Sequence, residues 1–131
     1  MSQEYRHKRT SVTLLHYHFV WIPARRRKVL VGPVAPRLEA LLREAAQRIE
    51  CEILYMALQP DHVHIVIAAP PTLGPDQIMF RLKGYTSRYL RQEFAHLRKM
   101  PSLWTRSYFC RTAGMVSSAV IQRYIEEQTA K

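Results

Sequence analysis

The chain has few cysteines and no long apolar run. Its two cysteines, Cys51 and Cys110, stand far apart among 131 residues, and this pattern matches neither a disulfide scaffold nor a CxxC metal knuckle. We expect both to be reduced, partly buried thiols. No apolar stretch approaches the roughly 20 residues of a membrane span, and residues 1–10 lack the apolar core of a signal peptide. We therefore expect a cytoplasmic protein.

Acidic residues are also scarce. Ten Asp and Glu stand against 20 Lys and Arg, which gives a formal charge of +10. Such a surplus favours a polyanionic partner, most often nucleic acid, although a basic surface that serves only solubility is the alternative. The sequence contains no phosphate-binding glycine loop of the P-loop kind and no carboxylate cluster of the kind that two-metal nucleases use.

The remaining composition fits one globular domain. The hydrophobic content of 47% supports a real core, and the length predicts a single domain over residues 1–131, in which we expect residues 1–10 to be flexible. Hydrophobic periodicity and the breakers between segments predict seven elements. The strands are Leu14–Ile22, Cys51–Leu58, His62–Ala69 and Leu103–Thr112, and the helices are Val34–Glu50, Asp76–Leu97 and a last one from Ser117 or Ser118 to Gln128.

The order of these elements predicts the fold class. Strand, helix, strand, strand, helix, strand is the order of a ferredoxin-like (RRM-like) α+β sandwich, with two helices on one face of an antiparallel sheet. The other face is left for a ligand, a nucleic acid or a partner subunit. The final helix is additional, and Gly114 in front of it is a candidate hinge.

His62 and His64 are the first candidate functional residues. Side chains alternate along a strand, so the two histidines share one face and lie about 7 Å apart along it, close enough for both rings to bind one divalent metal. Imidazole suits several divalent transition metals, but a third ligand must come from elsewhere. Asp61, directly before them, is expected to point to the opposite face and to serve the turn.

Tyr124 and Gln128 are the second pair. They stand four residues apart in a helical pattern and therefore share a face, and Gln128 can offer an amide oxygen to a metal. On spacing alone, an ordinary amphipathic helix with a half-buried tyrosine is the favoured interpretation. A free tyrosine has a pKa near 10, but a nearby cation would favour its phenolate and stabilise negative charge on a phosphate. The combination suggests phosphodiester chemistry with a tyrosine nucleophile.

The sequence resembles a known family along nearly its whole length, from about Val12 to Gln128. The run Pro60-Asp61-His62-Val63-His64 resembles the PDHVH strand of the single-tyrosine HUH transposases of the insertion-sequence 200/605 group. Further segments resemble this family in the same order along the chain, at residues 16–23 and 26–30 before this run and at 82–87, 103–109, 113–114 and 121–128 after it.

The resemblance implies a function and a set of roles. It implies His62 and His64 as metal ligands, Tyr124 as the nucleophile and Gln128 as the residue that completes a site for Mg or Mn. The implied activity is transposition: cleavage and rejoining of single-stranded DNA at hairpin-marked element ends through a covalent 5′-phosphotyrosine. It further implies a bacterial or archaeal homodimer whose active sites are shared between subunits, with residues 115–128 as a mobile catalytic helix.

Basic and aromatic side chains are the candidates for contact with DNA. The basic candidates are Arg25, Arg26, Arg27, Lys28, Lys83, Arg88 and Arg106. They would bind phosphates without reading the sequence, and for any one of them a solvated surface is the alternative. Unpaired bases could stack on Trp104, Tyr108 or Phe109, at least two of which we expect in the core.

Two other functions stay open at this point. One is a non-catalytic or domesticated protein of the same fold that binds single-stranded nucleic acid. The other is a metal-dependent hydrolase in which water attacks the phosphate, so that the product carries no protein. A covalent protein–DNA adduct that depends on a metal would distinguish the transposase from both.

Overall fold

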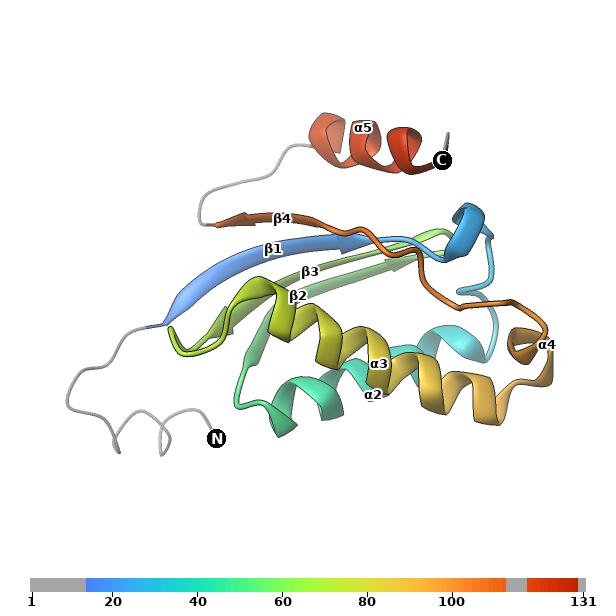
Figure 1. Ribbon diagram of the computed structural model, residues 1–131, viewed down its shortest axis with the longest axis horizontal. Coiled ribbons are helices and arrows are strands. Elements are labelled where there is room, and N and C mark those ends of the chain that lie inside the picture. Colours follow the sequence, from blue (N-terminus) through green and yellow to red (C-terminus); the bar gives the residue numbers. More distant parts are fainter. Residues whose placement is uncertain (1–13, 113–117, 130–131) are drawn as a thin grey trace.

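The computed structural model describes residues 14–112 and 118–129, and residues 1–10 and Gly114 lie outside these ranges. The elements form three layers: a four-stranded sheet lies between helix α5 (Ser118–Thr129) on one side and helices α2 (Val34–Arg48), α3 (Pro75–Glu93) and α4 (Ala95–Arg98) on the other (Figure 1). Within these ranges, no helix combines the length and the hydropathy that crossing a bilayer demands.

The sheet has the predicted antiparallel topology. Its strands are β1 (Leu15–Trp21), β2 (Glu52–Gln59), β3 (His62–Ala69) and β4 (Phe109–Thr112). They pair in the order β2-β3-β1-β4, and every pair is antiparallel. The ferredoxin-like α+β sandwich is therefore confirmed, and β3 has the predicted bounds.

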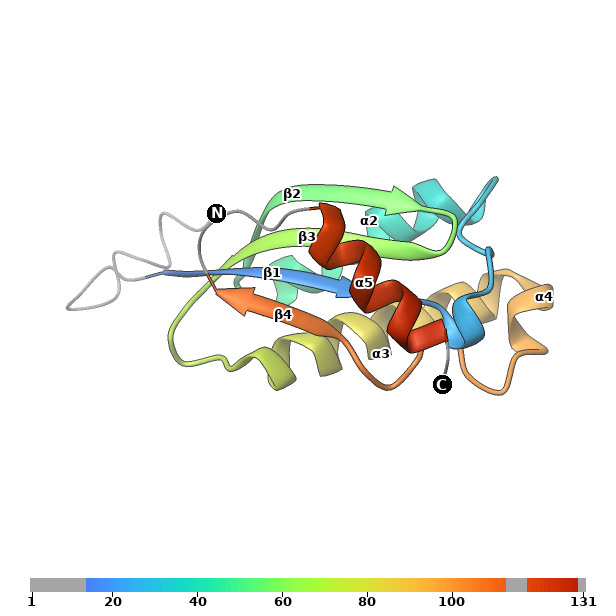
Figure 2. The same cartoon turned by 90° about the horizontal axis from the view of Figure 1, so that it is seen from above.

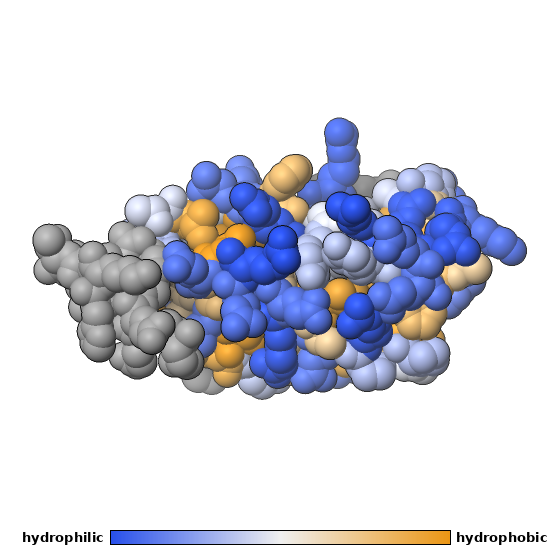
Figure 3. Space-filling view, turned by 90° about the horizontal axis from the view of Figure 1, so that it is seen from below, coloured by the Kyte–Doolittle hydropathy of each residue, from blue (hydrophilic) through white to orange (hydrophobic). Residues whose placement is uncertain are grey.

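One face of the sheet and one stripe of each long helix form the main core. Alternate residues of β1 and β3 point toward α2 and α3, as the two-residue period of a strand requires. The outer surface of these helices is mostly hydrophilic (Figure 3), so their apolar stripes turn inward. The large buried side chains of this core include Phe19, Trp21, Leu38, Leu41, Leu42, Ile65, Ile67, Ile78, Leu82 and Leu90.

The opposite face carries a second, smaller core beneath α5. Val20 and Ile22, which alternate with the residues of the main core, are fully buried against Tyr124 and Ile125 of α5. The helix crosses the strands obliquely, and most of β2 lies outside its outline (Figure 2). α5 therefore covers only part of this face, which we call the open face.

The predicted helix Asp76–Leu97 is wrong as a single element. α3 ends at Glu93, and Phe94 has an extended backbone (φ −121°, ψ 106°) before α4 begins. The break lets the Phe94 side chain pack against the main core. The guanidinium of Arg98 replaces the missing helical hydrogen bonds, since its Nη1 donates to the carbonyls of Arg91 and Gln92, both at 2.8 Å.

The predicted strand Leu103–Thr112 is also too long, because only Phe109–Thr112 pairs with β1. The Nζ of Lys83 donates to the carbonyl oxygens of residues 105, 106 and 107 at 2.7, 3.2 and 2.8 Å. Successive residues of a strand alternate in direction, so three consecutive carbonyls that converge on one ammonium are incompatible with a regular strand. Residues 103–108 form an irregular segment, which Lys83 of α3 stabilises from the helix side of the sheet.

The basic segment after β1 forms a short turn, η1 (Ala24–Arg26). Arg25 has φ 60° and ψ 23°, and Arg26 has φ 53°. Two consecutive side chains in the left-handed region are unusual, because the Cβ atom then crowds the backbone. This turn places Arg26 beside Asp61 and also contacts α5.

Candidate active site

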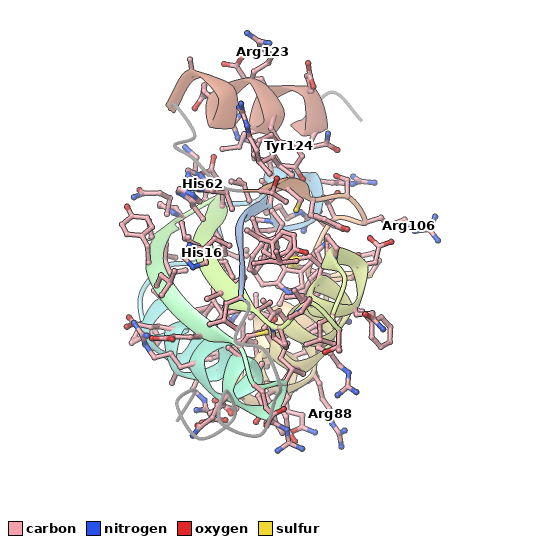
Figure 4. All side chains as sticks on the ribbon, turned by 90° about the vertical axis from the view of Figure 1, so that its left-hand side faces the viewer. His16, His62, Arg88, Arg106, Arg123 and Tyr124 are labelled. Carbon is pink, nitrogen blue, oxygen red and sulfur yellow. The ribbon has the colours of Figure 1, made fainter. Side chains whose placement is uncertain are left out.

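The two predicted metal ligands, His62 and His64, both lie on the open face of the sheet, which is the face on which α5 packs. Their neighbours Val63 and Ile65 are fully buried on the helix side of the sheet, while His62 and His64 are half-buried on the other. Figure 4 shows His62 on the strands below α5, and Tyr124 reaching down from that helix. Strand alternation thus gives the predicted pair of imidazoles on one surface.

Asp61 does not point away from His62, and this prediction is wrong. Its Oδ1 accepts a hydrogen bond from Nδ1 of His62 at 3.0 Å, and its Oδ2 accepts one from Nε of Arg26 at 2.8 Å. The error comes from applying strand alternation to a residue that lies in the turn before β3, where the alternation does not hold. Arg26, Asp61 and His62 therefore form one connected chain of side chains.

This chain fixes the form of His62. Burial alone would raise the pKa of Asp61, but the hydrogen bonds from Arg26 and His62 outweigh it and lower that pKa below its ordinary value. An ionised Asp61 holds the proton of the imidazole on Nδ1 and leaves Nε2 as the free donor atom. A carboxylate behind a metal-binding histidine has this orienting role in many metal sites.

His64 lies in a cluster of rings. Its Nε2 is 3.5 Å from Nδ1 of His18, and the two rings stack with their centroids 5.7 Å apart. Burial lowers the pKa of His64, and the neighbouring His18 and His62 lower it further. His64 is therefore neutral at neutral pH, which is the form that binds a metal.

His18 belongs to the site although it is not among the predicted site residues. The signal was present, since His16 and His18 repeat the two-residue spacing of His62 and His64 on the predicted first strand. Only the strand pairing reveals its position. In the register, His18 lies opposite Val66 and Val20 lies opposite His64, which brings His18 and His64 into diagonal contact on the open face.

Tyr124 and Gln128 do share a face of α5, and both contact Ser107. The Tyr124 side chain is 9% exposed, and its ring lies 6.0 Å from that of Phe109. The hydroxyl oxygens of Tyr124 and Ser107 are 3.2 Å apart, and Ser107 donates to Oε1 of Gln128 at 2.6 Å. Burial raises the pKa of Tyr124, and the hydrogen bond with Ser107 partly offsets this rise.

Ser107 connects the two residues through a single proton. A hydroxyl has one proton to donate, so while Ser107 donates to Gln128 it can only accept from Tyr124. When Tyr124 ionises, the same proton can turn to the phenolate, and the amide oxygen of Gln128 is then released. Ser107 has no role that the sequence predicts, because its importance arises only from the docking of α5.

The donor set fits a divalent metal. Among the described residues, no group of three or more His, Cys, Asp or Glu side chains could hold an ion, so a third ligand for His62 and His64 has to be of another type. The amide oxygen of Gln128 is the predicted third ligand. Imidazole suits several divalent transition metals and an amide oxygen suits harder ions such as Mg²⁺ and Mn²⁺, so these residue types are compatible with the predicted divalent metal.

Comparison with known proteins gives the same answer as the motifs. A family described as "Transposase IS200 like" matches residues 11–128. This chain belongs to that transposase family.

Curated relatives and a solved structure support the assignment. The transposase is 35% identical over 120 residues to the ISDra2 transposase TnpA of Deinococcus radiodurans, covering 89% of this chain and 86% of the relative. It is 30% identical over 115 residues to the transposase for insertion sequence element IS200 of Salmonella typhimurium, covering 86% and 75% of the two chains.

Two solved structures share the fold. A crystal structure described as that of a transposase from Deinococcus radiodurans R1 aligns with a TM-score of 0.85 at 35% identity, over 92% of this chain and 95% of the other. A REP-associated tyrosine transposase bound to a REP hairpin aligns with a TM-score of 0.52 at 16% identity, over 86% and 62% of the two chains. At that identity the second match shows the fold alone.

The predicted DNA contacts of the transposase fall into separate groups. Arg25, Arg27 and Lys28 are exposed on the segment at η1, near the end of β1. Arg26, in the same segment, binds Asp61 instead of facing solvent. Arg26 is thus the one that reaches the histidines, through Asp61, whereas Arg25 and Arg27 line a hollow with Met100, Pro101 and Ser102.

The other predicted basic residues lie elsewhere. Lys83 is committed to the three backbone carbonyls, and burial lowers its pKa to about 8. Arg88 and Arg106 are exposed, but both point away from the region between His62 and Tyr124 (Figure 4). The structure therefore gives Lys83 a structural role and places Arg88 and Arg106 outside the site.

The predicted stacking aromatics are all packed. Trp104 is buried and its Nε1 donates to the Thr86 hydroxyl at 3.0 Å. Tyr108 donates to Asp76, and Phe109 packs against Tyr124. The expectation that at least two of the three belong to the core is therefore met. Cys51 is buried, Cys110 is half-buried, and both are free thiols, as predicted.

Proposed function

We propose that this family member is a metal-dependent transposase that cleaves and rejoins single-stranded DNA at hairpin-marked element ends, with Tyr124 as the nucleophile. One observation carries the proposal. Tyr124 and Gln128 are held together by the Ser107 hydroxyl, above the same sheet face that presents His62 and His64. The nucleophile and all three proposed metal ligands therefore belong to one face of the molecule.

A divalent ion, Mg²⁺ or Mn²⁺, would be held by His62, His64 and Gln128, and when bound it would stabilise the negative charge that develops on the scissile phosphate. The protein prepares this site in advance. Arg26 holds Asp61, Asp61 holds the imidazole of His62, and burial keeps His64 neutral.

Tyr124 carries out the covalent step. Its phenolic oxygen bonds to the phosphorus, the bond from phosphorus to the 3′-oxygen breaks, and that oxygen leaves as a 3′-hydroxyl after taking up a proton. The product is a 5′-phosphotyrosine, which a second 3′-hydroxyl can attack to rejoin the strand with no further energy source. The phenol gives up its own proton to solvent before or during attack, and Ser107 assists by donating a hydrogen bond to the phenolate, which lowers the cost of ionising a buried tyrosine.

We also propose that the protein acts as a homodimer on DNA hairpins. The hairpin bound by the REP-associated neighbour supports the choice of substrate. The helix α5 packs on its own sheet mainly through Tyr124 and Ile125 against Val20 and Ile22. A contact this small can be reproduced between subunits, so that the tyrosine helix of one subunit serves the histidines of the other.

The deciding experiment detects the covalent adduct. Labelled single-stranded DNA from the flanks of the gene is incubated with the protein and Mn²⁺, and the products are separated under denaturing conditions. We expect a labelled adduct with the native protein and none with Tyr124→Phe, while both proteins bind the hairpin equally. Tyr89→Phe, which removes a hydroxyl from α3, is the matched control and retains the adduct. An adduct that persists in Tyr124→Phe rules out the mechanism.

One observation favours the non-catalytic alternative. The nucleophile is buried and its pKa is raised, which is what a tyrosine with a purely structural role would show. If the native protein binds the DNA but forms no adduct with Mg²⁺ or Mn²⁺, the chain is a DNA-binding member of the family. If it cleaves the DNA without becoming labelled, water is the nucleophile and the protein is a hydrolase.

A further inference from the structure

Three rings from three adjacent strands meet on the open face. Tyr55 of β2 contacts His64 of β3 edge to face, with the centroids 5.5 Å apart, and His64 stacks on His18 of β1 at 5.7 Å. We call Tyr55, His64 and His18 the ring cluster. One of its members is a proposed metal ligand, so the cluster and the proposed metal site are continuous.

The strand register places Tyr55 on the far side of His64 from the tyrosine helix. Val20 pairs directly with His64 and lies beneath Tyr124, whereas Tyr55 pairs with Val66, one row further along the sheet. A line across the open face therefore runs from Tyr124 through Val20 and His64 to Tyr55. A phosphate bound at the histidines would have the nucleophile on one side and the Tyr55 ring on the other.

Tyr55 is exposed in a way that the fold does not require. It is 53% exposed, and within the part of the chain that the structure describes no hydrogen bond uses its hydroxyl. The register of β2 shifts between Ile53 and Tyr55, and a bulge of this kind re-aims side chains next to functional sites. The bulge thus presents a large ring to solvent beside His64, where a buried position would have stabilised the fold more.

We propose that Tyr55, backed by His64 and His18, is the platform on which an unpaired base of single-stranded DNA stacks beside the phosphate held at the histidines. The proposal rests on the proposed function for the identity of the DNA, and it adds a base contact to the phosphate chemistry. Stacking on an aromatic ring is sequence-tolerant, because every base has a flat face.

Charge and size favour this occupant. The segment after β1, with the exposed Arg25, Arg27 and Lys28, lies at the end of the sheet where β3 begins with His62. Arg25 and Arg27 line a hollow there with Met100, Pro101 and Ser102, so they can bind the phosphates of a strand that continues past this end from the platform. A second protein chain is a poorer fit, since a stable interface buries roughly 1,200 Å² or more. The platform consists of one exposed ring with two half-buried imidazoles behind it.

The test separates the base from the phosphate. A short fluorescent oligothymidylate, about 12 nucleotides long to match the usual site size, is compared with an abasic strand of the same length and charge. Both are titrated with protein that carries Tyr124→Phe, so that the strand stays intact when Mn²⁺ is present. Tyr55→Ala, Tyr55→Leu and Tyr55→Phe are compared in this background, and Leu54→Ala, which alters a neighbouring side chain that is 46% exposed, is the matched control.

We expect Tyr55→Ala to weaken oligothymidylate binding about 5- to 100-fold, while Tyr55→Phe and Leu54→Ala bind like the parent. The oligothymidylate affinity of Tyr55→Leu should lie between those of Tyr55→Ala and Tyr55→Phe, because leucine keeps apolar area and loses the flat ring. All variants should bind the abasic strand equally. Unchanged melting temperatures show that the sheet is intact, as an exposed position predicts.

Three results would overturn the platform. They are unchanged oligothymidylate binding by Tyr55→Ala, an equal loss on the abasic strand, and a change of oligomeric state by light scattering with DNA binding preserved. These outcomes do not depend on cleavage. If the protein forms no adduct but needs Tyr55 for base binding, the proposed function is contradicted and the platform stands. If it forms the adduct but binds bases equally well without Tyr55, the proposed function stands and the platform is contradicted.

Discussion

The histidine half of the candidate site and its tyrosine half are held in place by different kinds of contact. His62 lies on a central strand of the sheet and is held by a chain of charged groups, from Arg26 through Asp61. Tyr124 lies on a helix outside the sheet, on a small apolar contact with Val20 and Ile22, and its hydroxyl meets one neutral serine. The first half is fixed by the fold, and the second is only docked onto it.

The strengths of the contacts explain why this difference matters. Hydrogen bonds between ionised groups are about twice as strong as neutral ones, and a neutral one contributes only about 0.5–1.5 kcal/mol net. A metal site has to keep its geometry through every step, whereas a nucleophile that becomes bonded to DNA has to move with its strand. The contrast matches what the proposed function needs, which is a rigid site for the metal and a tyrosine that can be released.

The largest effect is expected from His64→Ala, which breaks the histidine half. Loss of this proposed metal ligand should remove several kcal/mol of charge stabilisation, so cleavage should fall by about a thousandfold or more. Mn²⁺ binding by calorimetry should be lost together with it, while the metal-free protein still binds hairpin DNA. Full cleavage by this variant would show that the histidines hold no catalytic metal.

Asp61→Ala should weaken the same half without removing a ligand. The imidazole of His62 then loses the group that fixes its proton on Nδ1, and loss of such a carboxylate weakens metal binding about 10- to 100-fold. Asp61→Asn keeps an oxygen that can accept the hydrogen bond, so its Mn²⁺ affinity should lie between those of the native protein and Asp61→Ala. Equal Mn²⁺ affinity in all three proteins would mean that Arg26 and Asp61 serve only the turn.

Ser107→Ala tests the tyrosine half and should leave the histidine half intact. Without the Ser107 donor the pKa of Tyr124 rises further, so the alkaline limb of the rate profile moves to higher pH. At neutral pH the rate should fall about tenfold, as expected for one or two neutral hydrogen bonds. Mn²⁺ affinity should not fall, because Gln128 is released from Ser107, and Ser107→Thr should restore the rate. A loss of metal binding in Ser107→Ala would contradict the separation of the two halves.

Lys83→Met should have the smallest effect on cleavage and a visible effect on stability. Loss of the three carbonyl contacts should lower Tm by about 5 °C.

The pKa of Lys83 is about 8 in the folded protein and near 10.4 in an unfolded chain, so between these values the folded state binds fewer protons. The free energy of unfolding of the native protein should therefore rise as the pH increases from about 8 to 10. In Lys83→Met this rise should be reduced, and urea unfolding at several pH values measures the difference. Identical pH dependence in both proteins would show that Lys83 is not buried as described.

Strong periodic patterns made the fold predictable. The strand His62–Ala69 and the start of α2 at Val34 were predicted to the residue, because alternation and helical spacing are local signals. The break at Phe94 and the shortened β4 were not predictable from periodicity, since they depend on particular side-chain contacts with the backbone: Arg98 reaches carbonyls six and seven residues before it, and Lys83 reaches carbonyls 22 to 24 residues after it. In both places a side chain that binds the backbone decided against the local propensity.

The candidate site was only partly visible in the sequence. The shared face of His62 and His64 follows from the strand period, and that of Tyr124 and Gln128 follows from the helix period. The role of Asp61 was misjudged, because a turn obeys neither period. His18, Ser107 and Tyr55 gain their positions from strand register, helix docking and a bulge, and none of these is a local property of the chain.

The strained turn at Arg25 and Arg26 affects how the stability of the protein can be raised by substitution. Left-handed backbone at a residue other than glycine costs roughly 1–2 kcal/mol, and here two such residues follow one another. A glycine at position 25 would remove part of that cost, so a selection for heat resistance alone would favour it. The same glycine would loosen the segment that aims Arg26 at Asp61. A selection for transposition would keep the arginine, and the two kinds of laboratory evolution should diverge at this position.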